Sequence, residues 1–388
     1  MTQTRRGPVE ALVVHWGRWG GGPRFTLELA TALRGVLGEG RVALSTSRDA
    51  ELAPEVRRWG PGHQVHTYTS VVSFVLRLLA LPSLAAGFRR YLRRSGTRHV
   101  VCGMGSLYQS LVVPLVVPRG VTYYYCVHDA DFHPGEGNVV QRVGRFLELR
   151  RADVLVCFSA EVAHKLEQSG RVGARRLVRT VHPAYTTQGV EVLGGRPGPV
   201  HTPPVVGFLG RFTPYKGLDL LVEYAELVGQ RGEPVVVQAH GSGSFAGLED
   251  LMRTTAIDWH HGWIGEDEFA VRLDGFDVLL LPYREASQSG VLAQALSLGV
   301  PAVVTPVGGL AEQVTRSGGG LVAAETTAAA LADAVTRVLT DVGVYAELSR
   351  AALASASSDF SWDQVAADLQ AAMERSDELG SGSPPLRP

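Results

Sequence analysis

Short apolar runs alternate along the whole chain with longer segments in which apolar residues recur every three or four positions. Short runs rich in Val and Leu are typical of strands buried in a parallel sheet, and the longer periodic segments are typical of helices. In the first half, the pattern predicts strands at 10–15, 42–45, 65–68, 99–102, 121–127 and 154–158. It predicts helices most clearly at 25–37 and 161–169.

The same pattern restarts after residue 204. It predicts strands at 205–209, 235–239, 278–281, 302–305 and 320–323, with helices that include 291–298 and 327–339. A late helix is expected at 360–373, where Ser361 is the N-cap and Asp363 lies in the first turn. Two series of alternating strands and helices predict two α/β domains with parallel sheets and a cleft between them.

Breaks in the pattern set the domain boundaries. Residues 186–204 are rich in Gly and Pro and have little periodicity, which predicts a linker. The polar end of the chain predicts disorder. We therefore expect an N-terminal domain at 1–188, a linker at 189–204, a C-terminal domain at 205–358, a closing helix at 359–376 and a disordered tail at 377–388.

Length and composition agree with this organisation. The chain has 388 residues, more than one core usually serves, and it is 45% hydrophobic and 19% charged, as in ordinary globular proteins. Cys102, Cys126 and Cys157 lie at or near the ends of apolar runs without metal-ligand spacing, which indicates reduced, buried thiols. The apolar run at 11–14 is too short for a secretory signal. We expect a cytoplasmic protein that binds peripherally to the inner face of the membrane.

Charge is divided unevenly between the two halves. Residues 1–185 carry 25 Lys and Arg against 13 Asp and Glu, a net charge of +12. Residues 186–388 carry 12 against 25, a net charge of −13. Two explanations stay open: an anionic surface or substrate that faces the first half, or attraction between the domains across the cleft. We expect no nucleic acid partner.

The segment 71–94 combines apolar residues at helical spacing with Arg77, Arg89, Arg90, Arg93 and Arg94. Arg77 and Pro82 argue against a helix that spans a membrane. Either this segment lies on an anionic bilayer, where each cation adds about 1 kcal/mol, or it is a core-facing helix with a solvated basic face. Together with the basic first half, it points to a lipid-linked or otherwise anionic substrate.

The stretch 207–219 carries the strongest chemical signal. An apolar strand at 205–209 runs into Gly210, and the loop that follows presents Arg211 and Lys216 before a helix begins. Loops of this kind lie at the carboxyl edge of a parallel sheet, where ligands bind. Two cations on such a loop suit a ligand with a phosphate group.

Several further motifs follow in a fixed order. They are His240-Gly-Ser-Gly243, His261-Gly-Trp-Ile264, the strand end at 277–285, the helix start at 287–301 and Thr305-Pro-Val-Gly-Gly309. In this order they resemble glycosyltransferase family 4 (group 1), the retaining nucleotide-sugar transferases. The resemblance covers 205–323 and returns at 360–363. It implies a GT-B fold, in which two Rossmann-like domains face a cleft and a closing helix packs back toward the N-terminal domain.

The resemblance also implies roles for individual residues. Arg211 and Lys216 would stabilise the leaving diphosphate, helped by the amides at the start of a helix at Ser289, Gly290 and Val291. No metal or cofactor is then needed. Glu285 and His128 would contact the donor sugar. The remaining donor contacts would be Gly20, Gly21 and Gly22 of a glycine loop at 17–24, with Gly210, Gly241, Trp263, Ile264 and Gln294.

The chain departs from that family's pattern at Gln294, and its first half matches the family less closely than its second half does. Gln294 stands where the family carries a glutamate that holds the ribose, so this contact would lack charge assistance. In the first half, Asp129 follows His128, and Arg24, Asp129 and His133 are expected on the acceptor side.

The expected activity is therefore that of a hexosyl-type retaining glycosyltransferase (EC 2.4) acting on a hydroxyl acceptor. That acceptor would be a glycan, a lipid-linked precursor or a small molecule. Two alternatives remain: a sugar-nucleotide epimerase of similar fold, and a non-catalytic scaffold that binds nucleotide-sugars.

Overall fold

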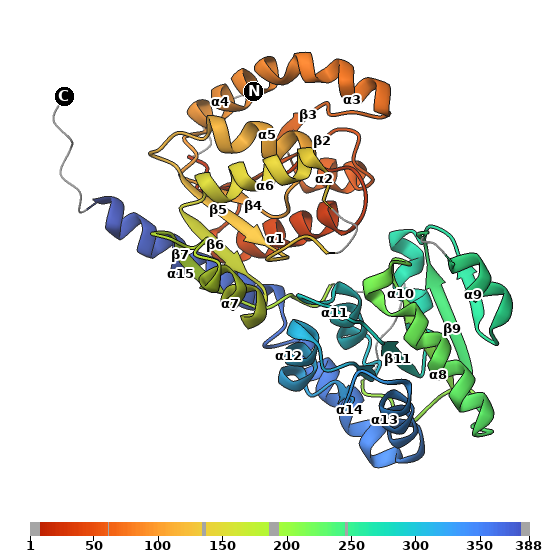
Figure 1. The fold of residues 1–388 in the computed structure, drawn as a ribbon. Coiled ribbons are helices and arrows are strands. Elements are labelled where there is room, and N and C mark those ends of the chain that lie inside the picture. Colours follow the sequence, from red (N-terminus) through yellow and green to blue (C-terminus); the bar gives the residue numbers. More distant parts are fainter. Residues whose placement is uncertain (1–7, 61, 134–136, 186–193, 245–246, 382–388) are drawn as a thin grey trace.

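The computed structural model describes residues 8–60, 62–133, 137–185, 194–244 and 247–381. These residues form two α/β domains, which Figure 1 shows as an upper and a lower body joined by a long C-terminal helix. Every pairing between neighbouring strands is parallel, as the series of alternating strands and helices predicted.

The N-terminal domain is built on a seven-stranded sheet with the order β3-β2-β1-β4-β5-β6-β7. Its strands are β1 (Ala11–His15), β2 (Val42–Ser47), β3 (His63–Val65), β4 (His99–Cys102), β5 (Thr122–Val127), β6 (Val154–Cys157) and β7 (Arg176–Arg179). Its helices are α1 (Gly21–Leu37), α2 (Ala53–Trp59), α3 (Val71–Arg77), η1 (Leu78–Ala80), α4 (Leu81–Ser95), α5 (Leu107–Val116), α6 (Val139–Arg151) and α7 (Ala160–Gln168).

The C-terminal domain has a six-stranded sheet with the order β10-β9-β8-β11-β12-β13. Its strands are β8 (Val205–Leu209), β9 (Val236–Gly241), β10 (Asp258–His261), β11 (Val278–Leu281), β12 (Ala302–Val304) and β13 (Gly320–Val322). Its helices are η2 (Pro214–Lys216), α8 (Leu218–Gln230), α9 (Leu248–Thr254), α10 (Glu266–Asp274), α11 (Gly290–Ser297), α12 (Gly308–Ser317), α13 (Ala328–Thr340) and α14 (Val342–Ala356).

The last helix, α15 (Trp362–Ser381), leaves the C-terminal domain and packs along α1 of the N-terminal domain (Figure 1). Trp362, Val365 and Leu369 are buried in the core that contains Phe25. The expectation of a disordered tail from 377 is wrong for residues 377–381, which are helical. Asp377 pairs with Arg98 and His99, and this contact holds the last turns of the helix. Residues 382–388 lie outside the described part of the chain.

Two edge strands, β7 and β10, were not predicted. β10 reads Asp-Trp-His-His and is largely exposed, and β7 places an arginine at each end. Edge strands keep polar side chains, and their sequences therefore lack the apolar run that identifies a central strand. The strand predicted at 65–68 is also displaced, because β3 pairs at His63–Val65.

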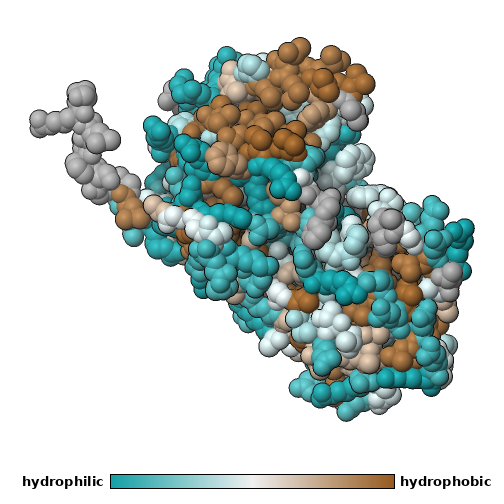
Figure 2. Space-filling view, in the orientation of Figure 1, coloured by the Kyte–Doolittle hydropathy of each residue, from teal (hydrophilic) through white to brown (hydrophobic). Residues whose placement is uncertain are grey.

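The segment 71–94 is only partly a core helix. In α4, Phe88 and Leu92 are buried, but α3 and η1 expose large apolar side chains: Val72 (69%), Val75 (58%), Leu76 (64%) and Leu79 (86%). Figure 2 shows apolar surface gathered over this end of the N-terminal domain and over the neighbouring α5 and α6. The helical stretch Val72–Ser95 contains 18 consecutive residues with a mean hydropathy of 1.4, of which 6% are buried, so by length and composition alone it could span a membrane.

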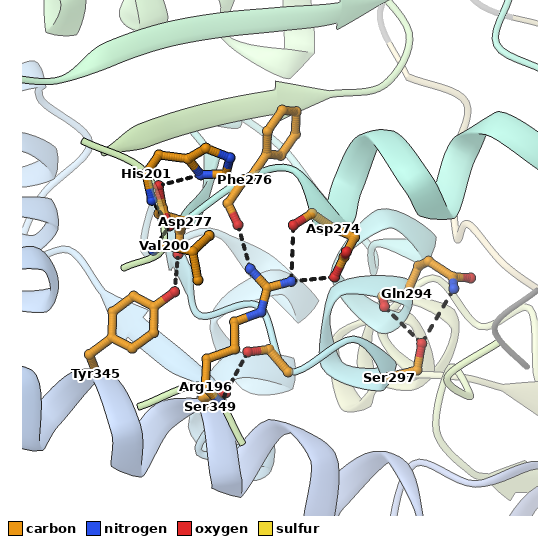
Figure 3. Close-up of polar contacts among 11 residues, drawn as sticks. Arg196, Val200, His201, Asp274, Phe276, Asp277, Gln294, Ser297, Tyr345 and Ser349 are labelled. Atoms are coloured by element: carbon orange, nitrogen blue, oxygen red, sulfur yellow. Dashed lines mark hydrogen bonds and ion pairs between the residues drawn. The ribbon is translucent and has the colours of Figure 1, made fainter. Parts of the chain in front are cut away.

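The described part of the linker, residues 194–204, is fixed to the C-terminal domain (Figure 3). The Arg196 guanidinium donates to the Phe276 carbonyl at 2.9 Å and pairs with Asp274 at 2.5 Å. The Asp277 carboxylate is fully buried and accepts from the backbone N–H groups of Val200 and Val205 and from the His201 side chain. The C-terminal sheet therefore holds the chain at the point where it enters β8.

A buried carboxyl group lies in the core of the N-terminal domain. Glu148 on α6 is fully buried and accepts hydrogen bonds from the Tyr123 hydroxyl and the Cys102 thiol. Burial raises the pKa of Glu148 from 4.5 to about 7, although its hydrogen bonds act in the opposite direction. Between pH 4.5 and 7, the folded protein therefore holds a proton on Glu148 that the unfolded chain has already released.

This proton makes the Glu148 contribution to folding fall as the pH rises from about 4.5 to 7. We expect the free energy of unfolding, relative to that of Glu148→Gln, to be lower at pH 8 than at pH 5 by on the order of 3 kcal/mol. Urea denaturation of both proteins at each pH measures the difference. The buried histidines titrate in both proteins, so their contributions to the free energy of unfolding cancel in the difference. A difference that does not change with pH would contradict the assignment.

Candidate active site

The carboxyl ends of β1, β4 and β5 meet around a cavity of about 480 Å³, as expected for the ligand edge of a parallel sheet. We call it the N-terminal cavity. Its lining includes His15, Arg18, Gly21, Gly22, Met104, Ser110, Tyr125, His128, Asp129, Asp131, Phe132 and Arg145. The glycine loop predicted at 17–24 is shorter than expected, because α1 already begins at Gly21. Pro23 suits this first turn, since it has no N–H that would need a partner there.

His15, which the sequence reasoning missed, is enclosed by the glycine loop. Its Nδ1 lies 2.8 Å from the Met104 carbonyl oxygen, so Nδ1 carries the proton and donates it. Burial lowers the pKa of His15 to about 4, which keeps the ring neutral. A Cβ atom on Gly17 or Gly22 would lie 2.3 or 2.4 Å from His15 Nε2. The only signal in the sequence was the position of His15 at the end of a strand.

His128 lies at the end of β5 and lines the same cavity. Its Nε2 donates to the Gly103 carbonyl oxygen at 2.8 Å, which leaves Nδ1 as a hydrogen-bond acceptor. The ring stacks on Phe158, with 4.8 Å between centroids. Burial lowers the pKa of His128. The site therefore presents a neutral imidazole that can accept a hydrogen bond.

His133 joins the two domains. Its ring stacks on Tyr215 of the C-terminal domain, with centroids 4.1 Å apart and planes 9° apart. Its Nε2 lies 3.3 Å from Asp129 Oδ1, and its Nδ1 lies 3.6 Å from Glu285 Oε2. Burial alone would raise the pKa of Asp129, but hydrogen bonds from His133 and Ser287 outweigh it, and the pKa falls. One imidazole thus lies between the two carboxylates that were expected on opposite sides of the cleft.

Arg211 and Lys216 lie on the C-terminal side of this contact. Arg211 donates to the Tyr215 hydroxyl at 2.9 Å, and Lys216 Nζ lies 3.7 Å from the centre of the Tyr283 ring. Burial raises the pKa of Tyr283 to about 12. Both cations therefore lie at the carboxyl edge of the second sheet, beside the tyrosine on which His133 stacks.

The start of α11 also faces the N-terminal domain. A Cβ atom on Gly290 would lie 3.5 Å from His182 and 3.7 Å from Tyr185. Ser289 caps the helix by accepting from the Leu292 N–H, and the Ser289 N–H donates to Gln313 Oε1 at 3.0 Å. Val291 is partly buried in the first turn. The positive end of the α11 dipole thus points toward the cleft.

The ends of β8 and β9 approach each other through Gly210 and Gly241. The φ angles of these residues are 149° and 156°, which side chains rarely adopt. A Cβ atom on Gly241 would lie 1.8 Å from the Gly210 carbonyl oxygen. Only glycine fits this crossing next to Arg211.

The structure does not bring every predicted residue to the cleft. Gln294 donates to Ser297 within its own helix at 3.3 Å (Figure 3). Arg24 pairs with Glu28 at 2.6 Å and does not line the N-terminal cavity. The Trp263 side chain is 59% exposed in the loop after β10, and its neighbour Ile264 packs against the core of the C-terminal domain. The backbone of Gly20 caps α1 with a φ of 78°.

The arrangement of the two domains identifies the architecture of the protein. Two parallel α/β domains in this arrangement confirm the expected GT-B architecture. Sucrose-phosphate synthase from Thermosynechococcus elongatus superposes with a TM-score of 0.67 at 17% identity, covering 97% of this chain and 100% of that one. HepE of Anabaena in complex with UDP-glucose superposes with a TM-score of 0.66 at 15% identity, covering 94% and 99%. At such identities the likeness concerns the fold.

Comparison with known sequences shows which GT-B proteins the second half of the chain resembles. Residues 203–341 match the family model described as "Glycosyl transferases group 1". A D-inositol 3-phosphate glycosyltransferase of Arthrobacter sp. (strain FB24) is 28% identical over 193 residues, 48% of this chain and 45% of that protein. A glycogen synthase of Thioalkalivibrio sulfidiphilus is 34% identical over 180 residues, 42% of this chain and 36% of that protein. The chain thus matches less than half the length of these relatives.

The close fit of the glycine loop around His15 can be tested by comparing two glycines of the same helix. Gly22→Ala should lower the free energy of unfolding by about 1–3 kcal/mol, because its methyl group meets a ring held in place by Met104. Gly35→Ala has open space and should raise it by about 0.5–1 kcal/mol. Urea denaturation compares the two variants. If both substitutions stabilised the protein equally, the packing around His15 would be wrong.

Proposed function

We propose that the protein is a retaining glycosyltransferase of family 4, which transfers a sugar from a nucleotide-diphospho-sugar to a hydroxyl acceptor in glycan biosynthesis. The observation that carries the proposal is the pair Arg211 and Lys216 at the edge of the second sheet, where Gly210, which precedes Arg211, lies against Val291 in the first turn of α11. Across the cleft, the N-terminal cavity provides neutral imidazoles. The match to group 1 glycosyl transferases supports the same activity.

The cations are assigned to the leaving group. When the bond from the anomeric carbon to the phosphate oxygen breaks, negative charge accumulates on the nucleoside diphosphate. Arg211, Lys216 and the N–H groups of Gly290 and Val291 would stabilise that charge, whereas the Ser289 N–H, which was also expected to take part, already donates to Gln313 Oε1. The proposed reaction requires no metal ion, because these groups neutralise the diphosphate.

His128 and Glu285 are assigned to the donor sugar. With its proton on Nε2, His128 can accept a hydrogen bond from a sugar hydroxyl through Nδ1. In a front-face reaction, the acceptor oxygen bonds to the anomeric carbon, and its proton passes to the departing phosphate oxygen. No protein base or nucleophile is then needed.

The remaining contacts are assigned by position. Gly20, Gly21, Gly22, Gly210 and Gly241 allow the backbone to approach the donor, and Trp263 and Ile264 border the base. Gln294 would have to exchange its bond to Ser297 for the ribose. Asp129 and His133 remain on the acceptor side, where His133 also orients Glu285. UDP-glucose, which the HepE structure contains, is the first donor to test.

We also propose that the protein is cytoplasmic and lies on the inner face of an anionic membrane through α3, η1 and α4. Val72, Val75, Leu76 and Leu79 are exposed on α3 and η1, and the arginines at 89–94 follow in α4. Apolar side chains inserted at the interface and cations near anionic headgroups are the two components of such binding. Arg77, in the middle of the apolar stretch, favours binding along the surface over spanning.

Removal of the leaving-group cation tests the proposed chemistry. Lys216→Ala should slow nucleotide release from the cognate donor by about 100-fold or more, because stabilisation of the leaving phosphate is lost. Lys165→Ala, at the chain's other lysine, which pairs with Glu161 on α7, is the matched control and should leave the rate unchanged. Near-normal turnover by Lys216→Ala, with the fold intact by circular dichroism, would remove Lys216 from this role. Donor binding without turnover in the wild-type protein would favour the scaffold alternative.

Vesicle binding tests the membrane surface. The double variant Leu76→Glu/Leu79→Glu should reduce co-sedimentation with phosphatidylglycerol vesicles by about tenfold or more, because both inserted side chains become charged. Val342→Glu changes a side chain that is 60% exposed on the other domain and serves as the control. Equal binding by the double variant and the wild-type protein would contradict the assignment.

A further inference from the structure

A second hollow of about 550 Å³ lies on the outer side of the N-terminal domain, between α6 and the segment 170–175. We call it the arginine pocket. The described residues that line it are Asp131, Phe132, Arg142, Arg145, Phe146, Leu149, Arg150, Gly170, Arg171 and Arg175. Asp131, Phe132 and Arg145 also line the N-terminal cavity, so the two hollows are neighbours that share a wall.

Positive charge dominates the arginine pocket. Its described lining contains five arginines and one carboxylate, that of Asp131, so the local balance is +4. Arg171 pairs with Asp131 at 2.7 Å and also donates to the Ala130 carbonyl at 2.6 Å. Neutral backbone carbonyls, rather than acids, receive most of the other hydrogen bonds from these guanidinium groups.

Three of the arginines show this arrangement directly. Arg145 donates to the carbonyls of Asp129 and Ala130, and Arg175 donates to three carbonyls, among them Arg150 O at 3.4 Å. Arg142 donates to the Gly137 carbonyl at 2.9 Å. Carbonyl bonds orient a guanidinium group but leave its full charge in place. Such a cluster of forked donors matches a phosphate or diphosphate, which can accept several charge-assisted bonds at once.

An apolar surface begins at the rim of the arginine pocket. On α6, Val139, Val143 and Phe146 are spaced as one helical stripe and are 75%, 46% and 60% exposed. The Phe132 ring lies on the inner side of the pocket, 4.9 Å from the Arg145 guanidinium. Figure 2 shows this apolar surface on the same face of the molecule as the helices proposed to bind the membrane. An anion pocket bordered by an apolar stripe suits an amphiphile.

We propose that the arginine pocket binds the phosphate or diphosphate of a molecule with an apolar chain, and that this chain lies along Val139, Val143 and Phe146. The shared wall would then place the molecule's head beside the N-terminal cavity, where the acceptor hydroxyl is needed. The statement that this molecule presents the acceptor hydroxyl rests on the proposed glycosyl transfer, whereas the binding of its phosphate does not. Two sources share this chemistry: a phosphorylated lipid acceptor and a phospholipid of the bilayer.

Calorimetric titration with geranyl diphosphate tests the pocket directly. The double variant Arg142→Gln/Arg150→Gln removes two exposed charges and should weaken binding by about tenfold or more. Arg57→Gln/Arg253→Gln removes two exposed arginines elsewhere and should bind as the wild-type protein does. Phe146→Ala should weaken binding of geranyl diphosphate but not of inorganic pyrophosphate. All titrations are repeated in the Arg211→Ala/Lys216→Ala background, which excludes binding through the leaving-group cations.

The two sources are distinguished by co-sedimentation with phosphatidylglycerol vesicles. If Arg142→Gln/Arg150→Gln binds geranyl diphosphate weakly but vesicles normally, the ligand is the acceptor. If both kinds of binding fall, it includes bilayer phospholipid. If the double variant binds the diphosphate as well as its control does, or if the wild-type protein does not bind it, the proposal is overturned. Nucleotide release by the same variants reports the proposed transferase activity separately, since donor cleavage in water does not need the pocket.

Discussion

The structure depends on one packing constraint: α15 must leave the C-terminal domain and bury its apolar face against α1. Trp362, Val365 and Leu369 enter the core around Phe25, and the Ser376 hydroxyl bonds to that of Tyr124 at 2.7 Å. The linker is fixed at its other end, where Asp277 holds Val200 and Val205. The chain is thus anchored in both domains, and the contacts of His133 with Tyr215 and of Gly290 with His182 show that the carboxyl edges of the two sheets face each other.

Two polar bridges are among the contacts between the domains. His133 contacts Tyr215 and Glu285, and Glu312 of α12 accepts from the Ala160 N–H at the start of α7, at 2.9 Å. A carboxylate at a helix N-terminus is favourable, and so is an imidazole between two carboxylates. These bridges join the basic half of the chain to the acidic half, but neither pairs a lysine or arginine with a carboxylate. In the arginine pocket, five arginines lie beside one carboxylate.

The sequence predicted central elements well and edges poorly. The strands at 99–102, 205–209 and 278–281 match residue for residue, because each is a buried, mainly apolar run bounded on both sides by a glycine, a proline or a charged residue. β7 and β10 were missed because edge strands keep polar side chains. Glu148 was missed because a glutamate between arginines in a helix suggests a solvent-exposed face, yet it is fully buried.

The residues of the site likewise fall into those that the sequence could predict and those that it could not. Arg211, Lys216 and the helix start at Ser289 follow a strand end, so local order alone placed them at one edge of a sheet. The stack of His133 on Tyr215 and the wrapping of the glycine loop around His15 depend on how distant segments pack, which no local pattern encodes. Gln294 could not be assigned either, because its bond to Ser297 depends on the side-chain rotamer.

The central claim is that the cleft cleaves a nucleotide-sugar with protein cations alone. The most direct test follows release of free nucleotide from UDP-, GDP- and dTDP-sugars by the purified wild-type protein, in the presence of EDTA and without an acceptor. We predict slow release from at least one donor at a rate that EDTA does not change. Absence of release from every donor, or release that stops when EDTA is added, would contradict the account.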